Sequence, residues 1–452
     1  MKPDCRIGGG TSALNYRHPL VSRISSFFAC LQNMPDAAVH RQVRWTPLAT
    51  ATAAVLMALD HGCPLYARFE DARVCMGSDF VQRRRVGGSY NGLMKALERQ
   101  AASVLPVLKK DLRRQAHERL DRIHKTAGWR LLAVDGSKED VPRTVDHEKA
   151  FGIADNGAYP QALLTAIVEV HTGLIWDWRM DRGRASERDH LLQMAPDLPA
   201  EALLLGDGYF VGFPIWSELD RLGKPFLIRA GGNVHLITRL WTGAVVRREH
   251  DVVYAWPAAL QHKVPPLKLR LIRIGQGPKA VYLLTNVLDP RRLSQRAAGT
   301  MYRCRWGVEL FFRTLKRTLG YAKLRSKVGR RARIELEWGL ITMMITAMLG
   351  IDSLGKRRIP PHRWSPARTI RTLRASLLRG AGKKTHRLHA ALDRAIASSL
   401  KDSYRRRNPK WSRHRPKTKN TPRSLILQPP NVRRATALEC ERATKYRPLT
   451  AA

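Results

Sequence analysis

Two short apolar runs, each ending in an aspartate followed by a glycine, constrain the fold of this chain more than any other feature. The first run is WRLLAVDGS, which places Asp135 before Gly136, and the second is EALLLGDGYF, which places Asp207 before Gly208. Short apolar runs bounded by turn residues are typical of strands buried on both faces. An open α/β sheet places its functional site at the carboxyl ends of such strands, where glycine permits close approach of a ligand. Taken alone, either Asp-Gly pair is equally an ordinary turn dipeptide.

The segments between and after these runs predict the rest of a sheet. Residues 161–170 and 174–180 are strand-like and are joined by a His-Thr-Gly turn, which indicates a hairpin. The sequence SERD from Ser186 has the form of a capping box, so a helix is expected to begin there. Residues 226–229 form a further strand-like run. The order strand, hairpin, helix, strand predicts a mixed α/β sheet.

Residues 231–284 are β-rich and lie between Asp207 and Glu309, which are 102 positions apart (309 − 207). A connection of that length is too long for a loop, so it is predicted to be a β-rich subdomain inserted in the sheet domain. Trp241 and Trp256 in this segment each offer an aromatic face on which an unpaired base stacks. Packing in the core is the preferred interpretation of both.

The stretch YRCRWGVELFFRTLK, residues 302–316, predicts an amphipathic helix with an unusual polar face. At about 100° per residue, an arc of roughly 60° contains Tyr302, Arg305, Glu309 and Lys316. The neighbouring arc is apolar and suited to packing on a core; it contains Val308, Phe311, Phe312, Leu315 and Leu319. A carboxylate between two cations and a phenol suits a metal ion beside a phosphate backbone. Salt bridges at helical spacing on a surface helix are the alternative interpretation.

The net charge of the chain is strongly positive. There are 80 Lys and Arg against 37 Asp and Glu, a formal charge of +43 over 452 residues. Such a charge favours a polyanionic partner and points to nucleic acid before membrane. The sequence has no run of 18 apolar residues, and its start, MKPDCRIGGG, lacks an apolar leader, so a cytoplasmic protein with no membrane partner is expected. The six scattered cysteines lack zinc-ligand spacing and are expected to be reduced.

The sheet domain is expected to span residues 126–350, with basic flanks on both sides. Residues 1–125 predict helices that form either a DNA-end-binding domain around the Arg83–Arg85 run or a scaffold with a solvated basic face. Residues 351–400 predict two amphipathic helices that pack on the sheet domain or on a second protomer. Residues 401–452 carry 15 Lys and Arg against 3 Asp and Glu, which predicts a flexible tail that contacts DNA phosphates or serves solubility alone.

These motifs together carry a family resemblance. The pattern Y-x2-R-x3-E-x6-K occurs without a gap in the helix described above, and it is accompanied by AVDGS at Asp135, GDGYF at Asp207 and YLLTN at residues 282–286. Over roughly residues 125–350 the chain resembles the DDE transposases of bacterial insertion sequences, in the family called insertion sequence four. The resemblance departs at Tyr209, because relatives often place an arginine before the aromatic residue there.

The resemblance implies an RNase H-like catalytic core flanked by helical regions. The catalytic and metal-ligating acids of the family correspond here to Asp135, Asp207 and Glu309. The residues that hold the DNA end beside the cut correspond to Tyr302, Arg305 and Lys316. The resemblance further implies a homodimer that pairs two element ends in a synaptic complex, a hairpin intermediate on the element end, and association with the bacterial nucleoid.

In-line cleavage of a phosphodiester agrees with this residue set. Two divalent cations about 3.5–4 Å apart activate the attacking oxygen and stabilise the leaving oxygen. Carboxylates suit Mg²⁺, with Mn²⁺ as a substitute. The expected function is metal-dependent cut-and-paste transposition, in which terminal inverted repeats are cut and the 3′ hydroxyl is joined to target double-stranded DNA. The alternatives are an RNase H-like nuclease that does not join strands and a domesticated DNA-binding protein without catalysis.

Overall fold

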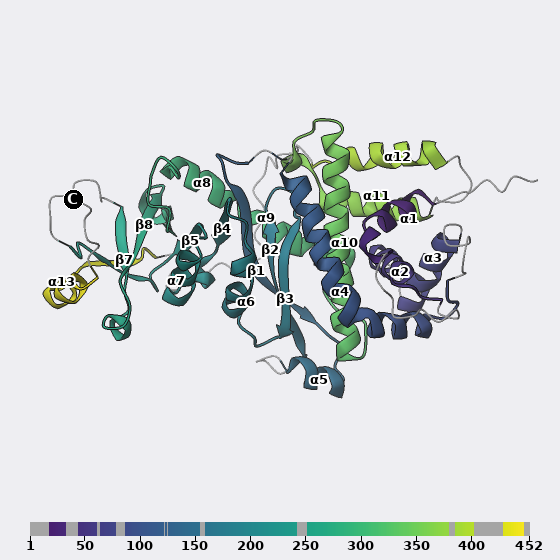
Figure 1. The fold of residues 1–452 in the computed structure, drawn as a ribbon, viewed down its shortest axis with the longest axis horizontal. Helices are drawn as coiled ribbons and strands as arrows, with labels where there is room; N and C mark the ends of the chain where they lie inside the picture. The colour runs from purple at the N-terminus through teal and green to yellow at the C-terminus, as the bar shows by residue number, and fades with distance from the viewer. Residues whose placement is uncertain are drawn as a thin grey trace, which may run out of the picture.

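A mixed ten-stranded sheet runs through the computed structural model of this protein (Figure 1). The structure describes residues 18–32, 44–60, 64–77, 86–121, 123, 125–153, 159–241, 251–378, 385–401 and 428–446. The Arg83–Arg85 run lies outside the described residues. The strands are β1 (Arg130–Asp140), β2 (Gln161–Glu169), β3 (Ile175–Arg182), β4 (Ala202–Gly206), β5 (Phe226–Ala230), β6 (His235–Thr238), β7 (Val252–Ala255), β8 (Leu267–Ile274), β9 (Val281–Thr285) and β10 (Asn431–Arg434).

Five strands form the centre of the sheet in the order β3-β2-β1-β4-β5. The pairs β1–β2 and β2–β3 are antiparallel, whereas β1–β4 and β4–β5 are parallel. These are the strand order and directions of an RNase H-like core. The predicted mixed α/β fold class is therefore confirmed, as is the hairpin formed by β2 and β3.

Burial of the two apolar runs explains why they form central strands. Leu131–Val134 on β1 and Leu203–Leu205 on β4 are at most 1% exposed. Strands in the middle of such a sheet are covered on both faces, so a continuous apolar run fits better than an alternating one. These apolar stretches are therefore core, and on β1 the polar residues from Asp135 onward begin just beyond the part of the strand that pairs with β4.

The β-rich segment at 231–284 extends the central sheet. β9 pairs antiparallel with β5, and β8, β7 and β6 follow outward. Trp256 is 4% exposed and donates its indole N–H to the Val264 carbonyl oxygen at 2.8 Å. Trp241 packs edge-to-face on Tyr254 with ring centroids 5.0 Å apart. The preferred interpretation of both tryptophans as packing residues is confirmed.

The helices lie mostly beside the edge strand β3 and on the sheet faces (Figure 1). They are α1 (Pro19–Ser26), α2 (Pro47–Leu59), α3 (Leu65–Gly77), α4 (Tyr90–Leu120), α5 (Val145–Phe151), α6 (Glu187–Met194), α7 (Phe213–Arg221), α8 (Gln295–Cys304), α9 (Trp306–Arg313), α10 (Gly329–Gly355), α11 (Pro366–Leu378), α12 (Thr385–Ala397) and α13 (Ala437–Thr444). The helix expected at Ser186 is α6, and the Ser186 hydroxyl accepts the Asp189 N–H at its start.

The apolar helix α10 joins the sheet to the other helices. It packs against α2, α4, α11, α12 and β3, and Figure 1 shows α4 and α10 between the sheet and α1–α3. Glu337 on α10 accepts the Trp178 indole N–H at 2.9 Å, and Arg113 on α4 contacts Asp177 at 2.9 Å. Among the described residues, α10 is the one helix long and apolar enough to cross a membrane, but 89% of its apolar window is buried inside the protein.

The expectation of a flexible tail over residues 401–452 is wrong for residues 428–446. In this segment β10 pairs parallel to β6, and α13 follows it directly. A small hydrophobic cluster packs α13 on the β-rich end; it contains Ile237, Leu240, Tyr254, Trp256 and Ala443. Composition describes the tail alone, whereas this segment has a strand partner 196 positions earlier in the chain (431 − 235) and an apolar partner in the β-rich end. Residues 402–427 and 447–452 lie outside the described residues.

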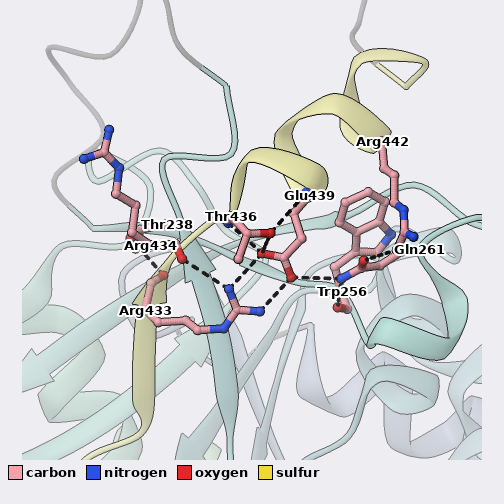
Figure 2. Close-up of polar contacts among 8 residues, drawn as sticks. All are labelled: Thr238, Trp256, Gln261, Arg433, Arg434, Thr436, Glu439 and Arg442. Carbon is pink, nitrogen blue, oxygen red and sulfur yellow. Dashed lines mark hydrogen bonds and ion pairs between the residues drawn. The ribbon is translucent and has the colours of Figure 1, made fainter.

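Glu439 connects α13 to the sheet (Figure 2). Its carboxylate accepts hydrogen bonds from two Arg433 nitrogens at 2.8 and 2.6 Å and from Gln261 Nε2 at 3.0 Å. It also accepts the Thr436 N–H at 2.9 Å, which completes a capping box at the start of α13. The hydrogen bonds from Arg433 are the main reason that the pKa of Glu439 falls to about 2.

Glu439→Gln should loosen residues 428–446 while leaving the central sheet intact. Glutamine keeps the size of the side chain but loses the charge that holds the Arg433 guanidinium, at a cost of roughly 1.5–3 kcal/mol. We expect backbone amides of residues 431–444 to exchange with deuterium roughly tenfold faster or more. Glu441→Gln, at an exposed position of the same helix, is the matched control and should leave exchange unchanged.

The same segment should be sensitive to acid. The Glu439 carboxyl has a lower pKa in the folded chain than its ordinary value of 4.5, so its stabilisation is fully present above pH 4.5 and is lost as the pH falls toward about 2. Exchange corrected for the intrinsic effect of pH should therefore accelerate on acidification in the wild type. Glu439→Gln should lack that acceleration, and equal acid sensitivity of the two proteins would refute the assignment.

Candidate active site

The two predicted aspartates lie side by side at the carboxyl-end edge of the sheet. In the parallel pair β1–β4, Ala133 is opposite Leu205. This pairing ends there, and two residues further on Asp135 lies within β1 and Asp207 directly follows β4, where the charge of Asp207 acts on Asp135. The juxtaposition follows from strand pairing alone, because the two residues are far apart in the sequence.

A backbone N–H group orients each aspartate. Asp135 Oδ1 accepts the Gly136 N–H at 2.9 Å. Asp207 Oδ1 accepts the Tyr209 N–H at 2.8 Å and so caps the short 3₁₀ helix Gly208–Phe210. Both carboxylates thus have a fixed orientation while their remaining oxygen lone pairs are free for another ligand.

The third predicted acid, Glu309, comes from α9, which packs against β1 and β2. The buried face of α9 consists of Val308, Phe311 and Phe312. Gly307 permits this close packing, because a Cβ there would overlap the Val170 carbonyl oxygen. Arg305 Nη2 donates to Glu309 Oε1 at 2.7 Å and holds the carboxylate at the edge of the sheet.

The charges of Asp207 and Glu309 act on Asp135, so the three acids lie near one another. Burial is the main cause that raises the pKa of Asp135 to about 6. The charges of Asp207 and Glu309 raise it further, whereas the Gly136 N–H and the Arg305 guanidinium lower it. Three like charges in a partly buried position repel one another unless a cation lies among them.

Tyr302 and Arg305 lie with these acids. Burial raises the pKa of the Tyr302 phenol to about 12, a change that the nearby guanidinium groups of Arg305 and Arg229 oppose and the charge of Asp207 reinforces. The phenol is therefore protonated at neutral pH and can donate a hydrogen bond. Tyr302 and Arg305 therefore lie near Glu309, as predicted.

Lys316 contacts a different part of β1, and the prediction of one regular helix is wrong. Helices α8 and α9 meet at Arg305, and residues Thr314–Leu319 form a π-helical turn. An arc drawn at 100° per residue holds only for a continuous α-helix. Lys316 Nζ donates to the Lys138 carbonyl oxygen at 2.7 Å and lies 3.5 Å from Glu139 Oε2.

Glu187 is an acid of this site that the sequence analysis missed. It is the first residue of α6. Burial, followed by the charges of Asp135 and Asp207, raises its pKa to about 7. A topological signal was available: β3 is parallel to β1 because both pair antiparallel with β2. The helix that follows β3 must therefore begin at the same sheet edge as the two aspartates.

Glu139 and Arg229 were also missed, because strand positions of this kind show no motif in a sequence. Glu139 is fully buried beside Lys316. Burial raises the pKa of Glu139 to about 7, and the Lys316 charge opposes that change. Glu139 therefore provides the electrostatic partner that keeps the Lys316 ammonium against β1.

The strand-edge acids suit a hard divalent cation. Carboxylate oxygens are the ligands that Mg²⁺ and Mn²⁺ prefer, and the gathered negative charge favours a bound cation. A second acidic group elsewhere, formed by His117, Asp121 and Glu201, has ligand atoms within 4.8 Å of one another. Arg130 already contacts Asp121 at 2.7 Å and Glu201 at 3.0 Å, so that group has its counter-charge. Arg305 likewise contacts Glu309, but among the described residues no salt bridge is found at Asp135 or Asp207, which makes the strand-edge acids the better candidate centre.

Gly307→Ala should displace α9 from the sheet. The new methyl group meets backbone rather than a movable side chain, so relief requires a shift of the helix and costs roughly 1–3 kcal/mol. We expect a lower midpoint of thermal unfolding. Gly355→Ala is the control, because a Cβ at that helix end meets nothing within 4 Å; equal effects of the two substitutions would show that the α9 contact is not tight.

Asp135→Asn should stabilise the metal-free chain at pH 7. The pKa of Asp135 rises from its ordinary 3.8 to about 6 on folding, so its ionisation opposes folding above both values and has no effect below pH 3.8. Removal of this charge should raise the midpoint of thermal unfolding by roughly 1–3 °C at pH 7. Asp220→Asn, at an exposed position, is the control. An unchanged or lower midpoint for Asp135→Asn would contradict the repulsion described here.

Comparisons with known proteins identify relatives of the sheet domain. Residues 127–346 match the family described as Transposase DDE domain. The chain is 25% identical over 227 residues to the transposase InsG for insertion sequence element IS4 of Escherichia coli (strain K12), and the match covers 47% of this chain and 50% of that protein. The chain thus spans about half the length of this curated relative.

A solved structure of piggyBac transposase in a synaptic complex with hairpin DNA aligns with 84% of this chain and 83% of its own, with a TM-score of 0.39 and 12% identity. That likeness is too distant to carry an argument. The family match rests on the sequence of the sheet domain, which contains the three strand-edge acids. Over residues 127–346 the chain is therefore similar to the transposase DDE domain family.

Proposed function

We propose that this chain is a DDE transposase that catalyses metal-dependent cut-and-paste transposition of its own insertion sequence. In this reaction the enzyme cuts at the terminal inverted repeats and joins the freed 3′ hydroxyl to target DNA. The observation that carries the proposal is the convergence of Asp135, Asp207 and Glu309 at one sheet edge, inside the matched domain.

The three acids would hold two Mg²⁺ ions. When bound, the ions supply an activated oxygen nucleophile and stabilise the leaving 3′ oxygen of an in-line displacement. The backbone N–H groups of Gly136 and Tyr209 orient the two aspartates for that role. Arg305 orients Glu309 and neutralises part of the charge while the centre is empty of substrate.

Tyr302, Arg305 and Lys316 are proposed to bind the DNA end beside the cut. The protonated Tyr302 phenol and the Arg305 guanidinium lie next to the acids and can donate to phosphate oxygens. The Lys316 side chain is 30% exposed, so its ammonium can reach a phosphate from its place beside Glu139. The formal charge of +43 supports a long duplex partner, since most of the affinity for DNA comes from phosphate contacts.

The remaining parts of the molecule are proposed to bind DNA and a second protomer. Residues 1–125 would bind the element ends, and two copies of the chain would pair those ends in a synaptic complex. The charge of residues 401–452 suits phosphate contacts by the tail, including its ordered segment at 428–446. Binding by these regions should weaken steeply with salt.

Glu309→Gln should abolish chemistry and retain DNA binding. The change keeps the size of the side chain and removes one charge from the metal centre, and the loss of a ligand should lower cleavage about 100-fold or more. The test incubates labelled DNA carrying the element's flanking repeats with Mg²⁺ and either wild type or variant. Cleavage at the repeat ends and joining to target DNA are expected for the wild type alone.

The controls separate the alternatives. Glu148→Gln removes a carboxylate from α5, away from the centre, and should cut and join like the wild type. Cutting without joining by the wild type would identify a nuclease. If neither wild type nor variant cuts, the chain is a DNA-binding protein without catalysis. Equal cutting by Glu309→Gln and wild type would remove Glu309 from the metal centre.

A further inference from the structure

The carboxylate of Glu187 lies against Gly136 of β1, the neighbour of Asp135. Successive positions of a strand face opposite sides of the sheet. Asp135 is on the side of Arg305 and Glu309, whose charges act on it, whereas the position of Gly136 is on the side of α6. Glu187 is the first residue of α6, after the Ser186 cap, and its carboxyl group lies beside the middle of β1.

Gly136 makes room for this carboxylate. A Cβ at position 136 would overlap the carboxyl group of Glu187, so that group rests directly on the Gly136 backbone. The N–H of the same glycine donates to Asp135 Oδ1 at 2.9 Å. The carboxylates of Asp135 and Glu187 therefore contact one residue from its two sides.

The Glu187 carboxylate has no cationic partner among the described residues that would make it half of a structural ion pair. Among the residues that the structure describes, none forms a hydrogen bond or salt bridge with it. Lys138 exerts a weak opposing charge, and the charges of Asp135 and Asp207 act against the ionised form. An acid half-buried among acids, without a cationic partner, is placed to ligate a cation.

We propose that Glu187 is a fourth carboxylate ligand of the divalent-metal centre. Its carboxyl group occupies the space that a side chain at position 136 would fill. The inference rests on the proposed metal-dependent function and adds a ligand from α6 to the three acids of the domain. Four ionised carboxylates balance the formal charge of two divalent cations. An acid in the first turn of a helix ordinarily interacts with the helix dipole. That role requires only a negative charge near the N-terminus and no particular position of the carboxylate.

The test measures binding of Mn²⁺ alone to the full chain, by the electron paramagnetic resonance signal of free Mn²⁺. Wild type should bind Mn²⁺, and Asp135→Asn should weaken that binding. Glu187→Gln should raise the Kd of at least one ion about tenfold or more, as expected when a ligand or its support is lost. Asp189→Asn, the same change two residues later in the exposed part of the first turn, should bind Mn²⁺ like the wild type.

Two further variants distinguish a ligand from a helix-dipole residue. Glu187→Asp keeps the charge at the helix start but withdraws the carboxylate from Gly136, so it should weaken Mn²⁺ binding nearly as much as Glu187→Gln. Gly136→Ala should push the flexible Glu187 side chain away and have the same effect. Its effect should largely disappear in the Glu187→Gln background, because both changes remove one ligand.

The outcomes separate this inference from the proposed function. Wild-type Mn²⁺ affinity and ion number in Glu187→Gln, with loss in Asp135→Asn, would overturn the role of Glu187 and leave the metal centre standing. Full binding by Glu187→Asp alone would assign Glu187 to the helix dipole. Absence of Mn²⁺ binding by the folded wild type, checked by circular dichroism, would overturn both the centre and its fourth ligand.

Discussion

The parallel pairing of β1 with β4 is the constraint on which the rest of the site depends. Leu131–Val134 and Leu203–Leu205 are buried on both faces and lock the register of the two strands. Full burial of each leucine contributes about 1.5–3 kcal/mol. A slip by one residue would turn every side chain of β1 to the opposite face and would separate Asp135 from Asp207. The apolar half of each strand thereby offsets the repulsion between the carboxylates at its end.

Helices fix the remaining side chains against this pair of strands. The glycine at 307 lets α9 rest on the turn after β2, so Glu309 is positioned by backbone contact rather than by its own flexible side chain. At Gly136 on β1 the contact is with the side-chain carboxyl group of Glu187 on α6. One glycine thus lets a helix approach the sheet, and the other leaves room for a carboxyl group beside β1.

Local patterns in the sequence were sufficient for the central elements and for three of the acids. The apolar runs before Asp135 and Asp207, the hairpin of β2 and β3, and the helix start at Ser186 each depend on neighbours within a few residues. The place of Lys316 was not predictable in the same way, because the π-helical turn at Thr314–Leu319 breaks the regular spacing on which the arc was drawn. A widened turn of this kind often occurs at functional sites.

Other features required knowledge of which distant segments meet. Glu187 resembled an ordinary helix-cap residue until the strand order placed α6 beside the aspartates. The segment at 428–446 was judged by its composition, although Arg433 and Glu439 find their partners in each other and in the β-rich end of the sheet. Composition describes how a segment behaves by itself, whereas both Glu187 and residues 428–446 depend on contacts with distant parts of the chain.

The parallel pair β10–β6 also bears on how the molecule is assembled. Asn431 lies opposite His235, 196 positions away (431 − 235). Contacts between such distant residues slow folding, because the entropy of closing the chain is lost before the contact forms. During that interval β6 is an open strand edge, which can pair with a second unfolded chain. Once β10 docks, Arg433 and Arg434 occupy the new edge and discourage the addition of further strands. Docking of β10 therefore covers the β6 edge and disfavours pairing with a second chain during folding.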